Sequence, residues 1–253
     1  MRISHKVRRH AIQLLFLALL IPPLYFLGVY WFGTYISGDL AGVSLTDPLT
    51  ALEVTLAGRT LWWPLWLSAL PLILVAVLLG RVFCSYVCPL NLLLELIPVK
   101  RRRQLEQKTW PIVALIVVLV VSLVMAVPVN NTYSPVFALM RGTLFGLGVE
   151  LVLVLLVLLA ALRWGQKIWC RTLCPLGALY GLLGLKRRLF VTIDEAHCTH
   201  CGACERACTM GTAPGRTELA DSYLCTNCGD CIDACHERAI HFTLKGGDCH
   251  ETK

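Results

Sequence analysis

Eight cysteines near the end of the chain follow a spacing that is typical of iron–sulfur proteins. The stretches 198-CTHCGACERAC-208 and 225-CTNCGDCIDAC-235 each follow the pattern CxxCxxCxxxC. In two-cluster ferredoxins the first three cysteines of such a run bind one [4Fe–4S] cluster, and the fourth binds the other cluster. The spacing therefore predicts two clusters with crossed ligand sets. These sets are Cys198, Cys201, Cys204 and Cys235 for the first cluster, and Cys225, Cys228, Cys231 and Cys208 for the second.

Structural zinc is the main alternative for these cysteines, because zinc sites also use pairs of the form CxxC. Zinc does not need a third cysteine at the same spacing, so we favour the clusters. Disulfides are not expected in a reducing cytoplasm. The proline that usually follows the fourth cysteine is replaced by Thr209 and His236, which alters the turn but not the number of ligands.

A second kind of cysteine motif, CxxxCP, occurs twice outside this region. It lies in 81-RVFCSYVCPLN-91 and in 169-WCRTLCPLGAL-179. Because residues i and i+4 share one face of a helix, each motif can present two thiolates together. We predict that Cys84, Cys88, Cys170 and Cys174 form one functional site. Three interpretations stay open, namely a third iron–sulfur site, redox-active dithiols, and buried structural cysteines beside a proline that ends a helix.

A few other residues could take part in chemistry. Glu150 is the only charge within an apolar run, and such residues often handle protons or substrate, although it can also sit at the end of the run. Asp47 precedes a proline, which favours a structural role in a turn. Cys249 is interpreted as a spare thiol. A bis-histidine haem buried among the apolar segments is not expected, because all histidines lie outside them, at positions 5, 10, 197, 200, 236, 241 and 250.

The elements that hold these residues are strongly apolar. Hydrophobic residues make up 57% of the chain and charged residues only 15%, against about 25% charged residues in soluble domains. Four runs reach the roughly 20 residues that cross a bilayer, at 11–37, 61–80, 110–130 and 143–162. We therefore predict an all-α four-helix transmembrane bundle over residues 1–189. Residues 190–253 are polar and contain the short β-prone pieces FVTID and AIHFTL, which indicates a separate α+β ferredoxin-like module.

The distribution of lysine and arginine predicts an orientation. These residues gather in 1–10, 100–108 and 163–188, whereas the other two connections hold only Arg59 and Arg141. By the positive-inside rule, both termini, both CxxxCP motifs and the ferredoxin-like module then face the cytoplasm. The order of apolar run and CxxxCPL motif occurs twice, which indicates two related halves that meet at one site. The net charge of +7 needs no nucleic-acid partner.

The motifs together resemble the NapH family, which comprises membrane ferredoxin-type subunits of periplasmic nitrate reductase systems. The resemblance is carried by RVFCSYVCPLN, CRTLCPLGALYGLLGLK, LTDPLTALE and the doubled cysteine pattern. It extends to the related MauN and NosR proteins of methylamine utilisation and nitrous oxide reduction. It covers nearly the whole chain.

The resemblance implies a haem-free quinol dehydrogenase subunit of the bacterial cytoplasmic (inner) membrane. Such a subunit takes electrons from quinol and passes them through a partner iron–sulfur protein toward a periplasmic reductase of the nitrate reductase type. The four CxxxCP cysteines and Glu150 are then the candidates for the reaction with quinol. A non-enzymatic alternative remains, namely a membrane-anchored iron–sulfur scaffold or maturation factor for another redox protein.

Overall fold

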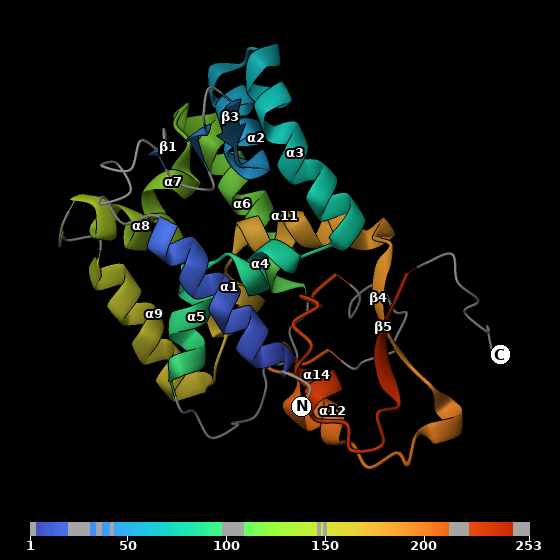
Figure 1. Ribbon diagram of the computed structural model, residues 1–253. Coiled ribbons are helices and arrows are strands. Elements are labelled where there is room, and N and C mark those ends of the chain that lie inside the picture. Colours follow the sequence, from blue (N-terminus) through green and yellow to red (C-terminus); the bar gives the residue numbers. More distant parts are fainter. Residues whose placement is uncertain are drawn as a thin grey trace.

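Helices form most of the part of the chain that the structure describes. The computed structural model describes residues 4–19, 31–33, 37–40, 43–97, 109–145, 148, 151–212 and 223–244. Figure 1 shows a helical unit and, against one end of it, a cysteine-rich module with a two-stranded sheet. The N-terminal helix begins beside the cysteine-rich module, so residues far apart in the sequence meet there (Figure 1).

The helical unit begins with one helix and a small sheet. These elements are α1 (His5–Leu19), β1 (Trp31–Gly33), β2 (Ser37–Leu40) and β3 (Val43–Thr46). The strands are antiparallel, with Phe32 opposite Asp39 and Ser37 opposite Thr46. The prediction of an all-α unit is wrong here. Gly33 and Gly38 disfavour a helix in this stretch, and the short strands instead satisfy one another's backbone groups.

Ten further helices complete the described part of this unit. They are α2 (Pro48–Gly58), α3 (Trp63–Leu79), α4 (Val82–Tyr86), α5 (Pro89–Leu96), α6 (Trp110–Met125), α7 (Val129–Tyr133), α8 (Pro135–Phe145), α9 (Leu151–Trp164), α10 (Ile168–Thr172) and α11 (Pro175–Leu183), followed by the 3-10 turn η2 (Gly184–Lys186). Several of these helices carry proline in their first turn, where its fixed φ suits the helix and its missing N–H is not needed.

The long apolar runs fold into helices that are shorter than the sequence predicts. α3 has 17 residues, α6 has 16 and α9 has 14, whereas crossing a bilayer takes about 20 residues. α3 ends at Gly80 with φ 75°, and α6 ends at Ala126 with φ 53°. Among the described residues, no helix combines the length and the apolar character that a bilayer crossing requires. The predicted four-helix transmembrane bundle is therefore wrong.

The hydrophobic core of the helical unit lies where the two CxxxCP motifs meet. Leu49 of α2, Phe83 of α4, Leu90 of α5 and Tyr180 of α11 belong to this core. The rings of Phe83 and Tyr180 lie 5.5 Å apart between centroids. The four CxxxCP cysteines pack against the same core, so core formation and assembly of the cysteine site depend on each other.

The cysteine-rich module has the α+β character that its sequence predicts. Its elements are β4 (Leu189–Ile193), the 3-10 turn η3 (Glu195–His197), α12 (Ala203–Ala207), α14 (Asp230–Asp233) and β5 (Ile240–Leu244). β4 and β5 are antiparallel and pair along their full length, from Leu189 opposite Leu244 to Ile193 opposite Ile240. β5 falls within the β-prone piece AIHFTL, whereas β4 begins one residue before FVTID, and the two strands close the module by joining its two ends.

Candidate functional site

The two CxxxCP motifs have the same local structure. Cys84 lies in α4 and Cys170 in α10, which are both helices of five residues. Cys88 and Cys174 are the N-caps of α5 and α11, and each is followed by proline at the first helical position. The prolines therefore begin a helix, which differs from the interpretation in which they end one.

The structure brings the four predicted cysteines of these motifs together. Burial and then the neighbouring thiols Cys170, Cys84 and Cys174 raise the pKa of Cys88 well above its ordinary value. Burial and then Cys84 raise the pKa of Cys170 to about 11, and burial and then Cys170 raise that of Cys174 to about 12. We call Cys84, Cys88, Cys170 and Cys174 the four-cysteine site. The thiols of Cys88, Cys170 and Cys174 are protonated at neutral pH unless a bound cationic group compensates the thiolate charge.

A buried basic residue precedes each motif, and the sequence analysis missed both. Arg81 stands three residues before Cys84, and Lys167 stands three residues before Cys170. Both are N-caps of the short helices, with relative exposures of 0% and 1%. Arg81 Nη2 donates to the carbonyl oxygen of Cys170 at 3.2 Å, so it reaches across to the other motif. The matching spacing of R-V-F-C and K-I-W-C was the signal that could have revealed them.

Glu95 of α5 connects the four-cysteine site to α1. Its carboxylate lies 2.8 Å from Lys167 Nζ, 2.7 Å from Arg9 Nη2 and 2.9 Å from His10 Nε2. Burial by itself raises the pKa of Glu95, but the charges of Lys167 and Arg9 outweigh it and hold the pKa at about 2. Arg9 and Lys167, which the sequence analysis counted as orientation signals, are thus buried in ion pairs.

The second ferredoxin site lies directly against this network. Arg9 Nη1 contacts Asp230 Oδ1 at 2.8 Å and donates to the carbonyl oxygen of Cys228 at 2.9 Å. Ser85 Oγ of α4 donates to the carbonyl oxygen of Thr226 at 2.9 Å. In Figure 1, α14 lies beside the start of α1. The loop that carries Cys225, Cys228 and Cys231 is therefore fixed to the same helices as the four-cysteine site.

The ligand set predicted for the second cluster is brought together by this loop and Cys208. Burial first, and then the thiols Cys228, Cys225 and Cys208, raise the pKa of Cys231 strongly. Asn227 adopts a positive φ of 52°, and its side-chain amide donates to the carbonyl oxygen of Leu79 at 3.0 Å. This turn presents the cysteines inward, and a donor set of four thiols fits a [4Fe–4S] cluster.

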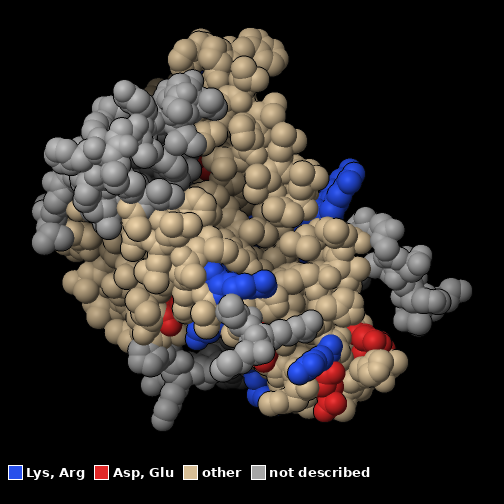
Figure 2. All heavy atoms as spheres, viewed as in Figure 1, with Lys and Arg blue, Asp and Glu red and all other residues tan. Residues whose placement is uncertain are grey.

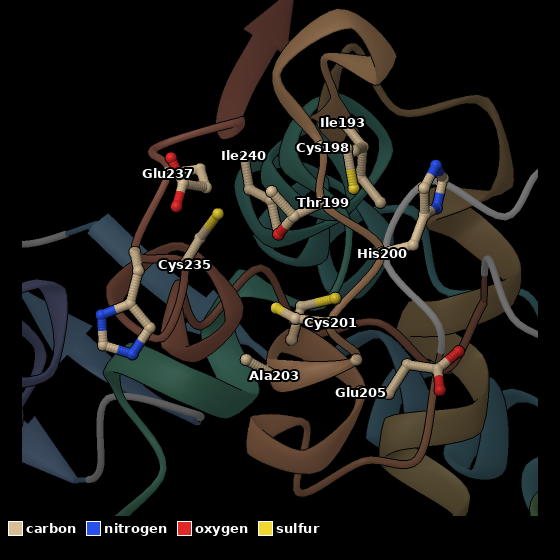
Figure 3. A pocket seen from close by; sticks show the side chains of 13 residues that line it. Ile193, Cys198, Thr199, His200, Cys201, Ala203, Glu205, Cys235, Glu237 and Ile240 are labelled. Carbon is tan, nitrogen blue, oxygen red and sulfur yellow. The ribbon is translucent and has the colours of Figure 1, made fainter.

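The ligand set predicted for the first cluster lines a single cavity of about 330 Å³. Figure 3 shows the sulfur atoms of Cys198, Cys201 and Cys235 turned toward a common space, and Cys204 is the fourth cysteine of the lining. His200 and Gly202 adopt φ 51° and 68°, which bends the backbone around this space. Cys201 is exposed, so this site reaches the surface of the protein. Four thiols around a hollow fit a [4Fe–4S] cluster.

The described residues contain no group of three or more histidine, cysteine, aspartate or glutamate side chains placed to hold a single metal ion. A [4Fe–4S] cluster has one cysteine at each iron, so its ligands stand farther apart than those of one zinc ion. The twelve cysteines that the structure describes are all free thiols.

Asp47 has the structural role that the sequence predicts and one further contact. Its Oδ2 accepts hydrogen bonds from the backbone N–H groups of Leu49 and Thr50, which caps α2. Its Oδ1 accepts a hydrogen bond of 2.9 Å from the hydroxyl of Tyr180. Asp47 is fully buried, and burial raises its pKa to about 7 against the opposing effect of these hydrogen bonds. Glu150 and Cys249 lie outside the described residues.

Comparison with known families identifies iron–sulfur binding regions. A family model described as a 4Fe-4S binding domain matches residues 60–106 and again residues 147–192. Each match contains one CxxxCP motif, so the same model recognises both halves of the predicted repeat. A second model, also described as a 4Fe-4S binding domain, matches residues 191–212. No solved structure matches the chain.

Several curated proteins are similar over most of their length. The ferredoxin-type protein NapH of Haemophilus influenzae is 35% identical, over 79% of this chain and 73% of its own. NapH of Escherichia coli is 34% identical, over 72% of this chain and 69% of its own length. The methylamine utilization ferredoxin-type protein MauN of Paracoccus denitrificans is 34% identical, over 71% of this chain and 67% of its own length. The chain therefore belongs to the family of the ferredoxin-type proteins NapH and MauN.

Proposed function

We propose that this chain takes electrons from quinol and passes them through three iron–sulfur sites to a partner iron–sulfur protein. Ferredoxin-type proteins with 4Fe-4S binding domains transfer electrons, and this coarse function holds for the family. The finer proposal is supported by one observation above all. The loop of the second ferredoxin site is hydrogen-bonded to α4, which carries Cys84, and to α1, while the first ferredoxin site opens to the surface.

The order of the three sites defines a route for electrons. The four-cysteine site is buried in the helical unit, the second ferredoxin site lies at the junction, and the first ferredoxin site lies at the exposed end. A bound [4Fe–4S] cluster supplies one-electron transfer at each site. Oxidation of one quinol to quinone releases two protons and two electrons, and because each cluster accepts one electron, the two electrons leave in successive steps. The partner docks near Cys201, where the chain exposes a cluster ligand.

The four-cysteine site serves this route best as a third cluster site. The same 4Fe-4S family model matches both CxxxCP motifs. The alternative of redox-active dithiols requires thiolates, whereas burial raises the pKa of Cys170 to about 11 and that of Cys174 to about 12. A metal group removes this difficulty, because it stabilises the thiolate form on binding.

We propose further that the chain acts at the bacterial cytoplasmic membrane, with the ferredoxin-like module on the cytoplasmic side and a periplasmic reductase of the nitrate reductase type as the final acceptor. Quinol is dissolved in lipid, and α3, α6 and α9 expose apolar side chains such as Leu67, Val124 and Leu155. On the face shown in Figure 2, charged side chains are sparse over the helical unit and gather toward the cysteine-rich module. Cell fractionation tests the location, and complete recovery in the soluble fraction contradicts it.

Reduction of the anaerobically purified protein by a quinol analogue tests the function. EPR spectroscopy should show cluster signals that grow with added quinol. Cys88→Ser and Cys174→Ser should lose this reduction, while dithionite still reduces the two ferredoxin clusters. Cys249→Ser serves as the control, because this cysteine belongs to none of the three sites. Normal quinol-dependent reduction of the clusters in both variants would contradict the proposal. Bound clusters that quinol never reduces would instead favour a scaffold or maturation factor.

A further inference from the structure

We propose that Arg81 is a counter-charge shared by the four-cysteine site and the second ferredoxin site, and that it makes both sites easier to reduce. This inference rests on the proposed function only in requiring clusters at these sites, not in requiring quinol as the donor. Arg81 would act as a positioning residue, through its charge and not by coordination.

The guanidinium of Arg81 is buried without a matching negative charge. Its side chain has a relative exposure of 0%. Nη2 donates to the carbonyl oxygen of Cys170, but Nε and Nη1 have no hydrogen-bond partner among the described residues. None of the ion pairs between described residues includes Arg81. A buried, unpaired charge is strongly unfavourable, which indicates that a bound anionic group completes this site.

The other CxxxCP motif shows what is missing around Arg81. Lys167 occupies the equivalent position before Cys170, and it is paired with Glu95 at 2.8 Å. Glu95 stands seven residues after Cys88, whereas the residue seven positions after Cys174 is Gly181. The first half of the repeat therefore supplies a carboxylate for the buried cation of the second half, whereas the second half has a glycine at the equivalent position and supplies none for Arg81. Among the described residues no carboxylate pairs with Arg81, and the thiolates of bound clusters are the negative charges that lie nearest to hand.

The path of the Arg81 side chain connects the two cysteine sites. A Cβ atom added to Gly177 would lie 2.3 Å from Arg81 Nη2 and 3.4 Å from Cys174 Sγ, so the guanidinium lies beside a sulfur of the four-cysteine site. A Cβ atom on Gly181 would lie 3.2 Å from Arg81 Cδ and 2.5 Å from the carbonyl oxygen of Tyr223. Tyr223 is two residues before Cys225, a predicted ligand of the second cluster.

The charge of Arg81 acts on both sites. Its guanidinium lies beside Cys174, and its Cδ lies near the backbone of Tyr223, two residues before Cys225. A [4Fe–4S] cluster with four thiolates carries a net negative charge and gains one more negative charge when it accepts an electron. A buried cation next to two such groups favours the reduced form of each, because the attraction is screened little in the interior.

Redox titration of the anaerobically purified protein tests this inference. Arg81→Gln removes the charge and keeps hydrogen-bond donors for the Cys170 carbonyl. We expect it to shift the reduction equilibrium of the four-cysteine cluster and of the second ferredoxin cluster by about tenfold each, which is about 59 mV toward lower potential for a one-electron couple. The first ferredoxin cluster should keep its potential and serve as an internal control.

Two further variants keep the test decisive. Arg81→Lys should stay close to the wild-type potentials, because it retains the charge and copies the residue of the other motif. Arg163→Met removes an exposed arginine of the second repeat and should change no potential. If Arg81→Gln does not accumulate, Arg81→Met takes its place with the same expected shifts. Unchanged potentials in a charge-free variant with full iron content, or equal shifts at all three clusters, overturn the proposal.

The titration also separates this inference from the proposed function. Dithionite is the reductant, so a failure of quinol oxidation leaves the result intact. If iron analysis shows only the two ferredoxin clusters, the third cluster site of the proposed function is wrong. The potential of the second ferredoxin cluster then still decides whether Arg81 acts on it.

Discussion

Lys167 Nζ lies 2.8 Å from Glu95 Oε1, and this ion pair joins the two CxxxCP motifs. Lys167 begins the helix of the second motif, and Glu95 lies near the end of the helix that follows the first. Because Glu95 also binds Arg9, and Arg9 binds Asp230, the same network reaches the second ferredoxin site. The helical unit and the cysteine-rich module are therefore connected through buried charges.

Glu95→Gln should destabilise the protein by about 3–5 kcal/mol, because it leaves the buried cations Lys167 and Arg9 without their shared counter-ion. Denaturant unfolding monitored by circular dichroism measures the change. Glu195→Gln is the control, because Glu195 is exposed and, within the described part of the chain, its ion-pair contact is a 3.7 Å approach to His200. Equal stability of the two variants would show that the network contributes little.

Glu95 also predicts a loss of stability in acid. Its pKa is lowered from 4.5 to about 2 in the folded state, so the folded protein binds this proton more weakly than the unfolded chain. The stabilisation from Glu95 is complete above pH 4.5 and disappears as the pH falls toward 2. The unfolding free energy of the wild type should therefore drop over this interval more steeply than that of Glu95→Gln.

The raised pKa of Asp47 predicts that the unfolding free energy falls as the pH rises. Its pKa is raised from 3.8 to about 7 by burial, so the folded protein holds this proton more tightly than the unfolded chain. The contribution of Asp47 is complete below pH 3.8 and is lost as the pH rises toward 7. Asp47→Asn should remove this slope while keeping the cap of α2, because asparagine caps helices as well as aspartate. Asp194→Asn changes a surface aspartate and should leave this pH dependence of the unfolding free energy unchanged. An unchanged slope in Asp47→Asn would contradict this assignment.

Metal analysis checks the two ferredoxin sites directly. The eight cysteines of the C-terminal module should hold about eight iron and eight acid-labile sulfide per chain, and a cluster at the four-cysteine site would add about four of each. Cys201→Ala and Cys228→Ala should each lose about four iron, because each removes one ligand of one cluster. Cys249→Ser should lose none. Zinc in stoichiometric amount without labile sulfide would mean that these cysteines form zinc sites.

Gly181→Ala should separate the helical unit from the second ferredoxin site. The added Cβ would lie 2.5 Å from the carbonyl oxygen of Tyr223, which is backbone and cannot rotate away. We expect a loss of about 1–3 kcal/mol in stability and a disturbed EPR signal of the second cluster. Gly148→Ala is the matched control, because a Cβ at Gly148 meets nothing within 4 Å. Wild-type stability and spectra in Gly181→Ala would show that this contact is unimportant.

Local pattern was sufficient to predict several features of this protein. The spacing of Cys198 to Cys208 and Cys225 to Cys235 predicts the crossed ligand sets, which stay a prediction, and the cysteines of each set lie near one another. The cap at Asp47 and the strands β4 and β5 also follow from a few neighbouring residues. Such features depend on the chemistry and backbone preferences of short segments, which the amino-acid sequence states directly.

Tertiary structure alone decided the length of the helices and the pairing of the buried charges. Helices α3 and α6 end before Gly80 and Ala126, where the backbone turns to positive φ, so hydropathy overestimated the lengths of the helices. Lys167 looked like an orientation signal because its partner, Glu95, is 72 positions away in the sequence. Burial and ion pairing are properties of segments that meet in space, and a reading of neighbouring residues cannot supply them.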